Sequence, residues 1–279
     1  MVKFNYVCLI GRPNSGKSTL LNNLVKKKVS IVTNKINTTV NNVLGVINDY
    51  KKQLFFIDTP GIVKLTKIKV EKKLVQKTFN EIKFTSIICI LLDVTNNNLD
   101  DTLLKFVKYV KLPLTVLILL NKIDLLKQKS KLLLMISAIR KIGFENVFLI
   151  SSKKNKNLER VINFIKTIKS KQINRCKVKN LTNKSLFSLT ESMTTEVLIK
   201  FLNKEVPYSI NVKTQFWREN IKKIKIYQTI FLKRKKCRKV VVQLNNRIIK
   251  KTNIVMKENI KKLTKKRNVF LYLNIKTDQ

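Results

Sequence analysis

The feature that most limits how this chain can fold is the segment at residues 11–18, Gly-Arg-Pro-Asn-Ser-Gly-Lys-Ser. It fits the pattern G-x-x-x-x-G-K-S, follows an apolar segment expected to form a strand at 6–10, and precedes an expected helix at 18–25. Glycines let the backbone approach phosphate oxygens closely, and the N–H groups at a helix N-terminus attract negative charge. The pattern therefore predicts a phosphate-binding loop in an α/β fold. Its predicted contacts are Gly11, Arg12, Pro13, Asn14, Ser15, Gly16, Lys17, Ser18 and Thr19.

Two later segments supply candidates for holding Mg²⁺ and a γ-phosphate. Residues 58–62 read Asp-Thr-Pro-Gly-Ile and follow an expected strand at 53–57. A carboxylate there can join the Ser18 hydroxyl around Mg²⁺, while Lys17 and the Gly61 N–H can meet the γ-phosphate. Residues 37–39 read Asn-Thr-Thr in a polar stretch, and we expect Thr39 to complete the Mg²⁺ shell. The predicted sets are Lys17, Thr39 and Gly61 for catalysis, Ser18, Thr39 and Asp58 for Mg²⁺, and Asp58, Thr59, Pro60, Gly61 and Ile62 for phosphate contacts.

A base-reading segment, Asn-Lys-Ile-Asp at residues 121–124, ends an apolar strand expected at 115–121. The Asp124 carboxylate can accept hydrogen bonds from guanine N1–H and the 2-amino group. Adenine lacks both donors, so ATP would leave the carboxylate unpaired. We expect Asn121 to tie this segment to the phosphate loop, the Lys122 stem to cover the base, and the Ser152 N–H to meet the guanine carbonyl. The predicted guanine-binding set is Asn121, Lys122, Asp124, Ser151, Ser152 and Lys153.

The order of apolar runs along residues 1–170 indicates one α/β domain. Expected strands lie at 6–10, 43–48, 53–57, 87–93, 115–121 and 146–150, and helices at 18–25, 103–110 and 131–141 lie between some of them. Strands that alternate with helices are typical of a mainly parallel sheet, here with 43–48 and 53–57 as an antiparallel hairpin.

The remaining chain predicts a linker and a second domain. Residues 171–185 are polar and basic, without an apolar period, and we assign them as the linker. Over 186–279 we expect a helix at 186–202, strands at 209–216 and 221–232, helices at 238–243 and 248–263 broken at 244–247, and a strand at 269–275. This order indicates a small α/β domain with one sheet.

Charge and composition restrict the possible chemistry and partners. The chain has no histidine, which excludes a Ser-His-Asp triad or a His-ligated metal within it. The net charge is +43, and residues 171–279 carry 28 Lys and Arg against 6 Asp and Glu. Such a field attracts RNA or an acidic membrane, although heavy use of Lys, Asn and Ile also suggests drift in an AT-rich genome. No apolar run reaches the roughly 20 residues that span a bilayer, and the N-terminus lacks a signal-peptide layout, so we expect a cytoplasmic protein.

Taken together, residues 1–170 resemble a translation-factor-type small GTPase domain. Within these residues, the closer resemblance is to the bacterial Era GTPase family. It is carried by Arg12, Pro13 and Asn14 in the phosphate loop and by the motifs at 37–39 and 58–61. Residues 196–217, with the turn Pro207-Tyr208-Ser209, resemble the segment that enters the KH domain of that family.

This resemblance implies a P-loop GTPase domain with a six-stranded, mainly parallel sheet, followed by a smaller α/β KH-like domain. It implies hydrolysis of GTP to GDP with Mg²⁺ and a role in small ribosomal subunit assembly. The implied partners are the 3′ region of small-subunit rRNA and the 30S-type subunit, bound by a monomer. Peripheral contact with the inner face of the cell membrane is also compatible with this resemblance.

Two departures from the pattern of that family bear on function. KH domains clamp the nucleic-acid backbone with a G-x-x-G loop, whereas the matching residues 243–246 read Gln-Leu-Asn-Asn. We therefore expect RNA binding by charge, through Arg238, Lys239, Asn245, Asn246, Arg247, Lys250 and Lys251. The other departure is Ile62, where some GTPases carry a water-orienting glutamine. It predicts slow intrinsic turnover, with the water placed by backbone groups, another side chain or a monovalent cation such as K⁺ near Asn14.

Two other functions stay open at this point. One is a GTPase that modifies tRNA or gates transport, which would need catalytic or membrane segments that we do not find in the sequence. The other is a non-enzymatic or weakly hydrolysing, nucleotide-dependent protein that binds RNA or a membrane surface. The complete set of Lys17, Ser18, Asp58 and residues 121–124 argues against the second alternative.

Overall fold

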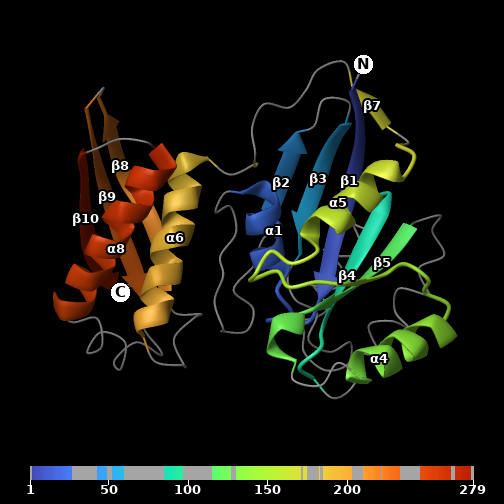
Figure 1. The fold of residues 1–279 in the computed structure, drawn as a ribbon. Helices are drawn as coiled ribbons and strands as arrows, with labels where there is room; N and C mark the ends of the chain where they lie inside the picture. Colours follow the sequence, from blue (N-terminus) through green and yellow to red (C-terminus); the bar gives the residue numbers. More distant parts are fainter. Residues whose placement is uncertain are drawn as a thin grey trace. The chain divides into compact units, whose positions relative to one another are not determined.

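A computed structural model describes residues 2–26, 43–48, 52–59, 85–96, 115–126, 130–170, 172–174, 182, 185–202, 210–220, 222–232, 246–264 and 268–277 (Figure 1). The described residues up to 182 form one compact unit, and those from 185 onward form a second. No helix among the described residues is long and apolar enough to cross a membrane. The helix expected at 103–110 lies outside the described residues.

The first unit is built on a sheet with the strand order β2-β3-β1-β4-β5-β6. These strands span Val2–Gly11 (β1), Val43–Asn48 (β2), Lys52–Asp58 (β3), Ile87–Asp93 (β4), Thr115–Asn121 (β5) and Val147–Leu149 (β6). Neighbouring strands pair in parallel, except that β2 runs antiparallel to β3. The six-stranded, mainly parallel sheet and its hairpin are therefore confirmed.

A short strand, β7 (Gln172–Asn174), adds a seventh member to this sheet from the segment assigned as linker. It pairs antiparallel with residues 2–4 of β1. Those residues precede the part of β1 that pairs with β4, which begins at Val7. Because β1 is longer than the predicted 6–10, it leaves backbone groups open to another strand, and β7 satisfies them.

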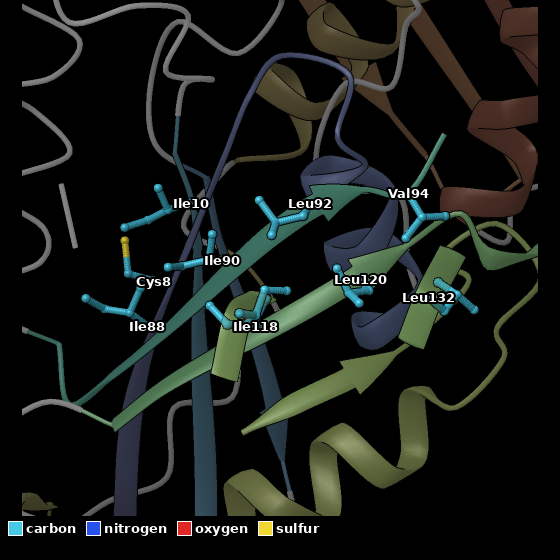
Figure 2. Packing of buried hydrophobic residues seen from close by; sticks show 10 residues of the cluster. Cys8, Ile10, Ile88, Ile90, Leu92, Val94, Ile118, Leu120 and Leu132 are labelled. Carbon is cyan, nitrogen blue, oxygen red and sulfur yellow. The ribbon is translucent and has the colours of Figure 1, made fainter. Parts of the chain in front are cut away.

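The core of the first unit explains why β4 and β5 read as almost continuous apolar runs. Strands of a parallel sheet are covered on both faces, so neither face needs to be polar. One cluster of buried side chains covers a face of β1, β4 and β5 and includes two residues of α4 (Figure 2). Its members are Cys8, Ile10, Ile88, Ile90, Leu92, Val94, Ile118, Leu120, Leu132 and Ile139.

The described helices of the first unit are α1 (Lys17–Val25), α4 (Ser130–Lys141) and α5 (Leu158–Thr167), with a 3₁₀ turn η1 (Ile123–Leu125). Helix α1 packs closely over β2 at Gly45. A Cβ atom at Gly45 would lie 2.5 Å from Leu21 Cδ1 and 2.7 Å from Val25 Cγ2. This packing fixes the helix that follows the phosphate loop against the sheet.

The described part of the second unit consists of two helices on one face of a three-stranded sheet (Figure 1). The elements are α6 (Leu186–Phe201), β8 (Ile210–Glu219), β9 (Lys223–Leu232), α8 (Asn246–Thr264) and β10 (Asn268–Thr277). Strand β9 lies in the centre, antiparallel to β8 and parallel to β10. Two clusters of buried residues join the helices to the sheet, around Leu198 and Ile230 in one case and Met256 and Ile226 in the other.

Some boundaries in the second unit were predicted wrongly: the strand expected at 209–216 continues to Glu219, and the helix expected at 248–263 begins at Asn246. The expected break at 244–247 includes Asn246 and Arg247, but these residues are the first two of α8. Asn246 therefore belongs to a helix and does not provide the positive φ that a G-x-x-G loop would use. The helix expected at 238–243 lies outside the described residues.

Candidate functional site

The carboxyl ends of the parallel strands bring the predicted nucleotide motifs to one edge of the sheet. Gly11 ends β1, Asp58 ends β3, and Asn121 ends β5. Open α/β sheets bind their ligands at this edge. Four segments that are far apart in the sequence can thus act on one ligand, because residues 151–153 follow β6 at the same edge.

The phosphate loop closes onto α1 through Gly16, which has a φ of 103°. A side chain is strained in this left-handed region, and a Cβ atom at Gly16 would also lie 2.2 Å from Asn121 Nδ2. Asn14 adopts a φ of 63° in the same loop, and its side chain is exposed, as is that of Arg12. The loop conformation therefore depends on a residue without a side chain at position 16.

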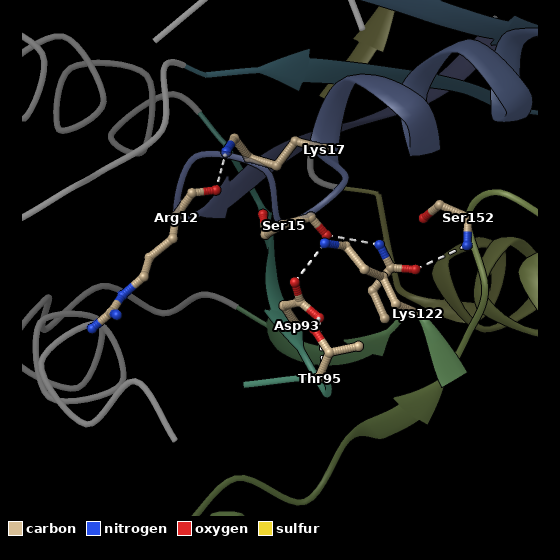
Figure 3. A network of polar contacts seen from close by, with 8 residues as sticks. Arg12, Ser15, Lys17, Asp93, Thr95, Lys122 and Ser152 are labelled. Atoms are coloured by element: carbon tan, nitrogen blue, oxygen red, sulfur yellow. Dashed lines mark hydrogen bonds and ion pairs between the residues drawn. The ribbon is translucent and has the colours of Figure 1, made fainter. Parts of the chain in front are cut away.

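Lys17 is buried beneath the loop that it follows. Its Nζ donates to the carbonyl oxygen of Gly11 at 2.9 Å and to that of Arg12 at 3.0 Å, the second of which is drawn in Figure 3. Burial lowers the pKa of Lys17 to about 8, and the nearby Asp58 carboxylate partly opposes this shift. Negative charge brought next to the ammonium group would stabilise its charged form.

Ser18 and Asp58 form a compact pair of oxygen donors. The Ser18 hydroxyl donates to Asp58 Oδ2 at 2.6 Å, and Asp58 is fully buried. Hydroxyl and carboxylate oxygens suit Mg²⁺, which is usually held by one or two protein carboxylates and by substrate phosphates. The described residues contain no cluster of three or more His, Cys, Asp or Glu that could hold a metal. The Ser18 and Asp58 oxygens therefore fit Mg²⁺ bound together with nucleotide phosphates.

Thr59 occupies a structural position beside this pair. It is fully buried, and its hydroxyl donates to the carbonyl oxygen of Leu9 at 2.7 Å. The Thr59 hydroxyl therefore fixes the end of β3 to β1. Thr39, Pro60, Gly61 and Ile62 lie outside the described residues.

Asn121 joins three loops of the site. Its Nδ2 donates to the carbonyl oxygen of Ser15 at 2.7 Å, and its Oδ1 accepts from the Ser152 N–H at 2.9 Å (Figure 3). The expected tie between Asn121 and the phosphate loop is present. The Ser152 N–H, however, is directed to Asn121, which differs from the expected contact with a guanine carbonyl. Asn23 of α1 donates to the Ser152 carbonyl oxygen and fixes the same loop from the other side.

Asp124 is prepared to accept hydrogen bonds as a carboxylate. A hydrogen bond from the Ser151 side chain lowers the pKa of Asp124, and the positive charges of Lys153 and Lys154 add to this shift. Its Oδ1 is buried and has no hydrogen-bond partner among the described residues. A buried acceptor without a partner is costly, and a ligand that supplies a donor removes that cost.

Lys122 is fixed by an acid that the sequence did not single out. Its Nζ lies 2.5 Å from Asp93 Oδ2, and Asp93 Oδ1 accepts from both the N–H and the hydroxyl of Thr95 at 3.0 and 2.7 Å (Figure 3). Asp93 ends β4 at the same edge as Asp58 and Asn121. Its position at a strand end was the one available signal, because no motif includes it.

Comparisons with known proteins agree with this geometry. The family described as 50S ribosome-binding GTPase matches residues 6–122. A GTPase Era from Buchnera aphidicola subsp. Acyrthosiphon pisum (strain Tuc7) is 33% identical over 264 residues, which cover 92% of this chain and 91% of the relative. The chain belongs to the Era GTPase family. As a member of this family, it binds GTP and hydrolyses it to GDP and phosphate.

Other Era proteins match over nearly the full chain. GTPase Era of Mycoplasmopsis pulmonis (strain UAB CTIP) is 29% identical over 279 residues, which cover 99% of this chain and 94% of the relative. A crystal structure of Era with MgGDPNP and nucleotides 1506–1542 of 16S ribosomal RNA has a TM-score of 0.87 and 26% identity, covering 100% of this chain and 94% of that one. A variant of Aquifex aeolicus Era bound to GDP·AlF₄⁻ has a TM-score of 0.88 and 27% identity, with coverage of 99% and 94%.

In this Era-family chain, we expect Asp93→Asn to weaken GDP binding by about twofold to fivefold, because a partly exposed ion pair contributes up to about 1 kcal/mol. The amide no longer forms an ion pair with Lys122, so we expect the Lys122 stem, the predicted cover of the base, to be held less firmly. Release of a fluorescent GDP analogue, followed by stopped flow, measures the change. Glu159→Gln, an exposed acid in the first turn of α5, serves as the matched control. Equal release rates in all three proteins would contradict the role of Asp93.

We also expect GDP binding to take up protons above neutral pH. Lys17 has a pKa of about 8 in the free site. Phosphate oxygens raise that pKa on binding, so the complex holds a proton that the free protein has partly lost. Calorimetry in buffers of different ionisation enthalpy should give uptake of about half a proton at pH near 8 and almost none near 6.5. Affinity should accordingly fall as the pH rises above 8, and no uptake at any pH would contradict this account.

Proposed function

We propose that this chain acts in assembly of the small ribosomal subunit. In this proposal the second unit is a KH-like domain that binds small-subunit rRNA near its 3′ end, and the nucleotide in the first unit controls that binding. The observation that carries the proposal is the likeness, over 100% of this chain, to an Era structure that holds MgGDPNP and nucleotides 1506–1542 of 16S ribosomal RNA. Both units of the chain are included in that match.

The charge on α8 supports RNA as the partner of the second unit. Arg247, Lys250 and Lys251 are exposed within the first turns of the helix, beside Asn246 at its start. Charged side chains of this kind neutralise phosphates without reading the base sequence. Arg238, Lys239 and Asn245, which complete the proposed surface, lie outside the described residues. We therefore propose binding mainly through the RNA backbone on this surface.

In the nucleotide site we propose that Ser18, Asp58 and Thr39 hold Mg²⁺ together with phosphate oxygens. When bound there, Mg²⁺ would neutralise charge on the phosphate oxygens. Lys17 Nζ, held by the carbonyls of Gly11 and Arg12, is aimed at the β- and γ-phosphates, and the N–H groups of the loop surround them. Gly61 is proposed to contact the γ-phosphate and so to register its loss on hydrolysis.

For base recognition we propose that Asp124 accepts from guanine N1–H and the 2-amino group, with Lys122 over the ring. The buried Oδ1 without a partner and the lowered pKa of Asp124 support this role. Since the Ser152 N–H is directed to Asn121, we propose that residues 151–153 act chiefly by fixing Asn121 and Asp124. An adenine base would leave the Asp124 carboxylate without donors.

Three finer parts of the proposal concern the surroundings of the reaction. With Ile62 in place of a glutamine, we propose that a K⁺ ion near Asn14 supplements the positive charge at the phosphates. We propose that the protein works as a monomer in the cytoplasm. Its positive charge also favours peripheral contact with the inner face of the cell membrane.

The experiment is a titration of the full chain with a fluorescent oligonucleotide from the 3′ end of small-subunit rRNA and with a scrambled oligonucleotide. Each titration is run with a GTP analogue and with GDP over a series of salt concentrations. We expect the native oligonucleotide to bind more tightly than the scrambled one. This preference should require the GTP analogue and should persist at high salt. A matched triple variant, Arg247→Gln, Lys250→Gln and Lys251→Gln, should flatten the salt dependence, because about three fewer counterions are released.

Equal and steeply salt-dependent binding of both oligonucleotides would contradict the proposal. It would leave a GTPase whose second unit binds polyanions without selection. Equal RNA affinity with the GTP analogue and with GDP would favour the alternative of a basic RNA- or membrane-binding protein in which hydrolysis has no regulatory role.

A further inference from the structure

Among the described residues, one face of the sheet of the second unit carries no helix. Helices α6 and α8 lie together on the other face (Figure 1). Buried residues such as Val212, Ile226 and Leu271 point to that helical side. By the two-residue period of strands, their neighbours in sequence point to the opposite side, which we call the open face.

A row of aromatic residues crosses all three strands on the open face. The strand register pairs Phe216 of β8 with Tyr227 of β9, and Tyr227 with Tyr272 of β10. These side chains are 50%, 39% and 45% exposed, respectively. Phe270, which is 41% exposed, lies two residues before Tyr272 on the same face. Four large aromatic side chains on one small sheet face are unusual unless something covers them.

The rings in the row are arranged as a partial stack. Tyr227 and Tyr272 lie nearly parallel, with ring centroids 4.5 Å apart and an angle of 11° between the planes. Phe216 meets Tyr227 edge-on, with centroids 5.7 Å apart and an angle of 68°. Tyr227 is therefore enclosed between two rings. Among the described rings, Tyr272 has Tyr227 on one side only, and its strand is at the edge of the described sheet.

A bulge in β8 places Phe216 in this row. The register shifts between Thr214 and Phe216, which leaves Gln215 without a partner. Thr214 points to the helical side, where Gln228 Nε2 donates to its hydroxyl at 3.3 Å. Strict alternation would place Phe216 on that same side, and the extra residue turns it to the open face.

Basic side chains flank the aromatic row. In the cross-strand row next to the aromatic row, Arg218 of β8 lies opposite Lys225 of β9, and Lys225 lies opposite Phe270 of β10. The described positions of this face hold the basic residues Lys213, Arg218, Lys223, Lys225 and Lys276, and none of these positions holds Asp or Glu. The face therefore combines ring surfaces with positive charge only, and this is complementary to a chain of bases joined by phosphates.

We propose that the open face binds single-stranded RNA, with a base stacked on the free side of Tyr272 and phosphates on the flanking lysines and Arg218. Aromatic rings on a sheet, with cations beside them, bind unpaired bases with little dependence on sequence. A duplex cannot offer an unstacked base to Tyr272. This inference takes from the proposed function only that the partner is RNA. The surface itself is a different one, because it lies on the face of the sheet opposite α8.

The test uses the full chain with a labelled oligoadenylate and with an RNA duplex of equal length. We expect Tyr272→Ala to weaken oligoadenylate binding by about tenfold, equivalent to about 1.4 kcal/mol, and to leave duplex binding within about twofold. Tyr272→Phe keeps the ring and should bind oligoadenylate nearly as the parent does. Lys225→Gln with Lys276→Gln should reduce the salt slope for oligoadenylate by about 1.4, since each single-strand phosphate contact contributes about 0.7.

Unchanged oligoadenylate binding by Tyr272→Ala, or an equal loss for duplex, would overturn the inference. If Tyr272→Ala lowers the melting temperature, Tyr272→Leu replaces it, because leucine keeps apolar bulk without a planar ring. If Tyr272→Ala lost binding to phosphatidylglycerol vesicles while its RNA binding was unchanged, that result would also overturn the inference and would assign the face to a membrane. None of these outcomes depends on the preference for a native over a scrambled 3′-end sequence, so the proposed function is judged separately.

Discussion

Replacing Asp124 with asparagine should weaken GTP binding by about a hundredfold or more and relax discrimination against xanthosine nucleotides. The carboxylate, which Ser151 and the nearby lysines hold in its charged form, accepts from two guanine donors in our account. An amide cannot accept both bonds, but its N–H group can donate to the carbonyl that xanthine carries at position 2. Competition of GDP and of xanthosine diphosphate against a fluorescent GDP analogue measures both effects.

The neighbouring variant Asp93→Asn provides the matched control for this change. It removes a carboxylate from the same edge of the sheet and loosens Lys122, but it does not remove a group proposed to pair with the base. We expect it to weaken both nucleotides by similar factors. A preference for guanine that is unchanged in Asp124→Asn would show that another residue reads the base.

The second large effect is expected for Lys17→Ala, which should lower the rate of GTP hydrolysis by about a hundredfold to a thousandfold or more, since one preorganised donor is lost from the transition state. The fold should survive. Burial lowers the pKa of Lys17 to about 8, so the folded protein holds this charge at a cost in free energy that alanine removes. Phosphate release measures the rate, and a melting curve measures the fold.

Lys141→Ala is the control for this variant, because Lys141 is exposed in the last turn of α4. It should hydrolyse GTP at the parent rate. Retained turnover in Lys17→Ala would show that the phosphate loop has been assigned to the wrong residues. Loss of the folded state would instead mean that the bonds from Lys17 to Gly11 and Arg12 stabilise the loop.

The sequence predicted the nucleotide motifs and the strands that carry them because each has a local signal. A buried parallel strand such as β5 is a short apolar run, and the residues that bind a ligand follow its carboxyl end. The contacts of Asn121 and the pairing of Ser18 with Asp58 follow from this geometry. The motifs restrict which fold is possible, and that fold restricts where the motifs lie. The nucleotide site could therefore be predicted more fully than the second unit.

Features without a local signal were missed or predicted with wrong bounds. Strand β7 forms only because the start of β1 extends past β4, and this is a property of the assembled sheet. The roles of Asp93 and Asn23 depend on distances between loops that the sequence does not specify. The aromatic row on β8, β9 and β10 depends on a bulge, because one inserted residue decides which face Phe216 takes.

We propose that GTP hydrolysis in the first unit releases RNA from the second. The most direct test loads the protein with a fluorescent 3′-end rRNA oligonucleotide and either GTP or a non-hydrolysable analogue, then follows RNA anisotropy and phosphate release together after unlabelled RNA is added. Our account predicts that RNA leaves at the rate of phosphate release with GTP and stays bound with the analogue. RNA that leaves at the same rate with both nucleotides would contradict it.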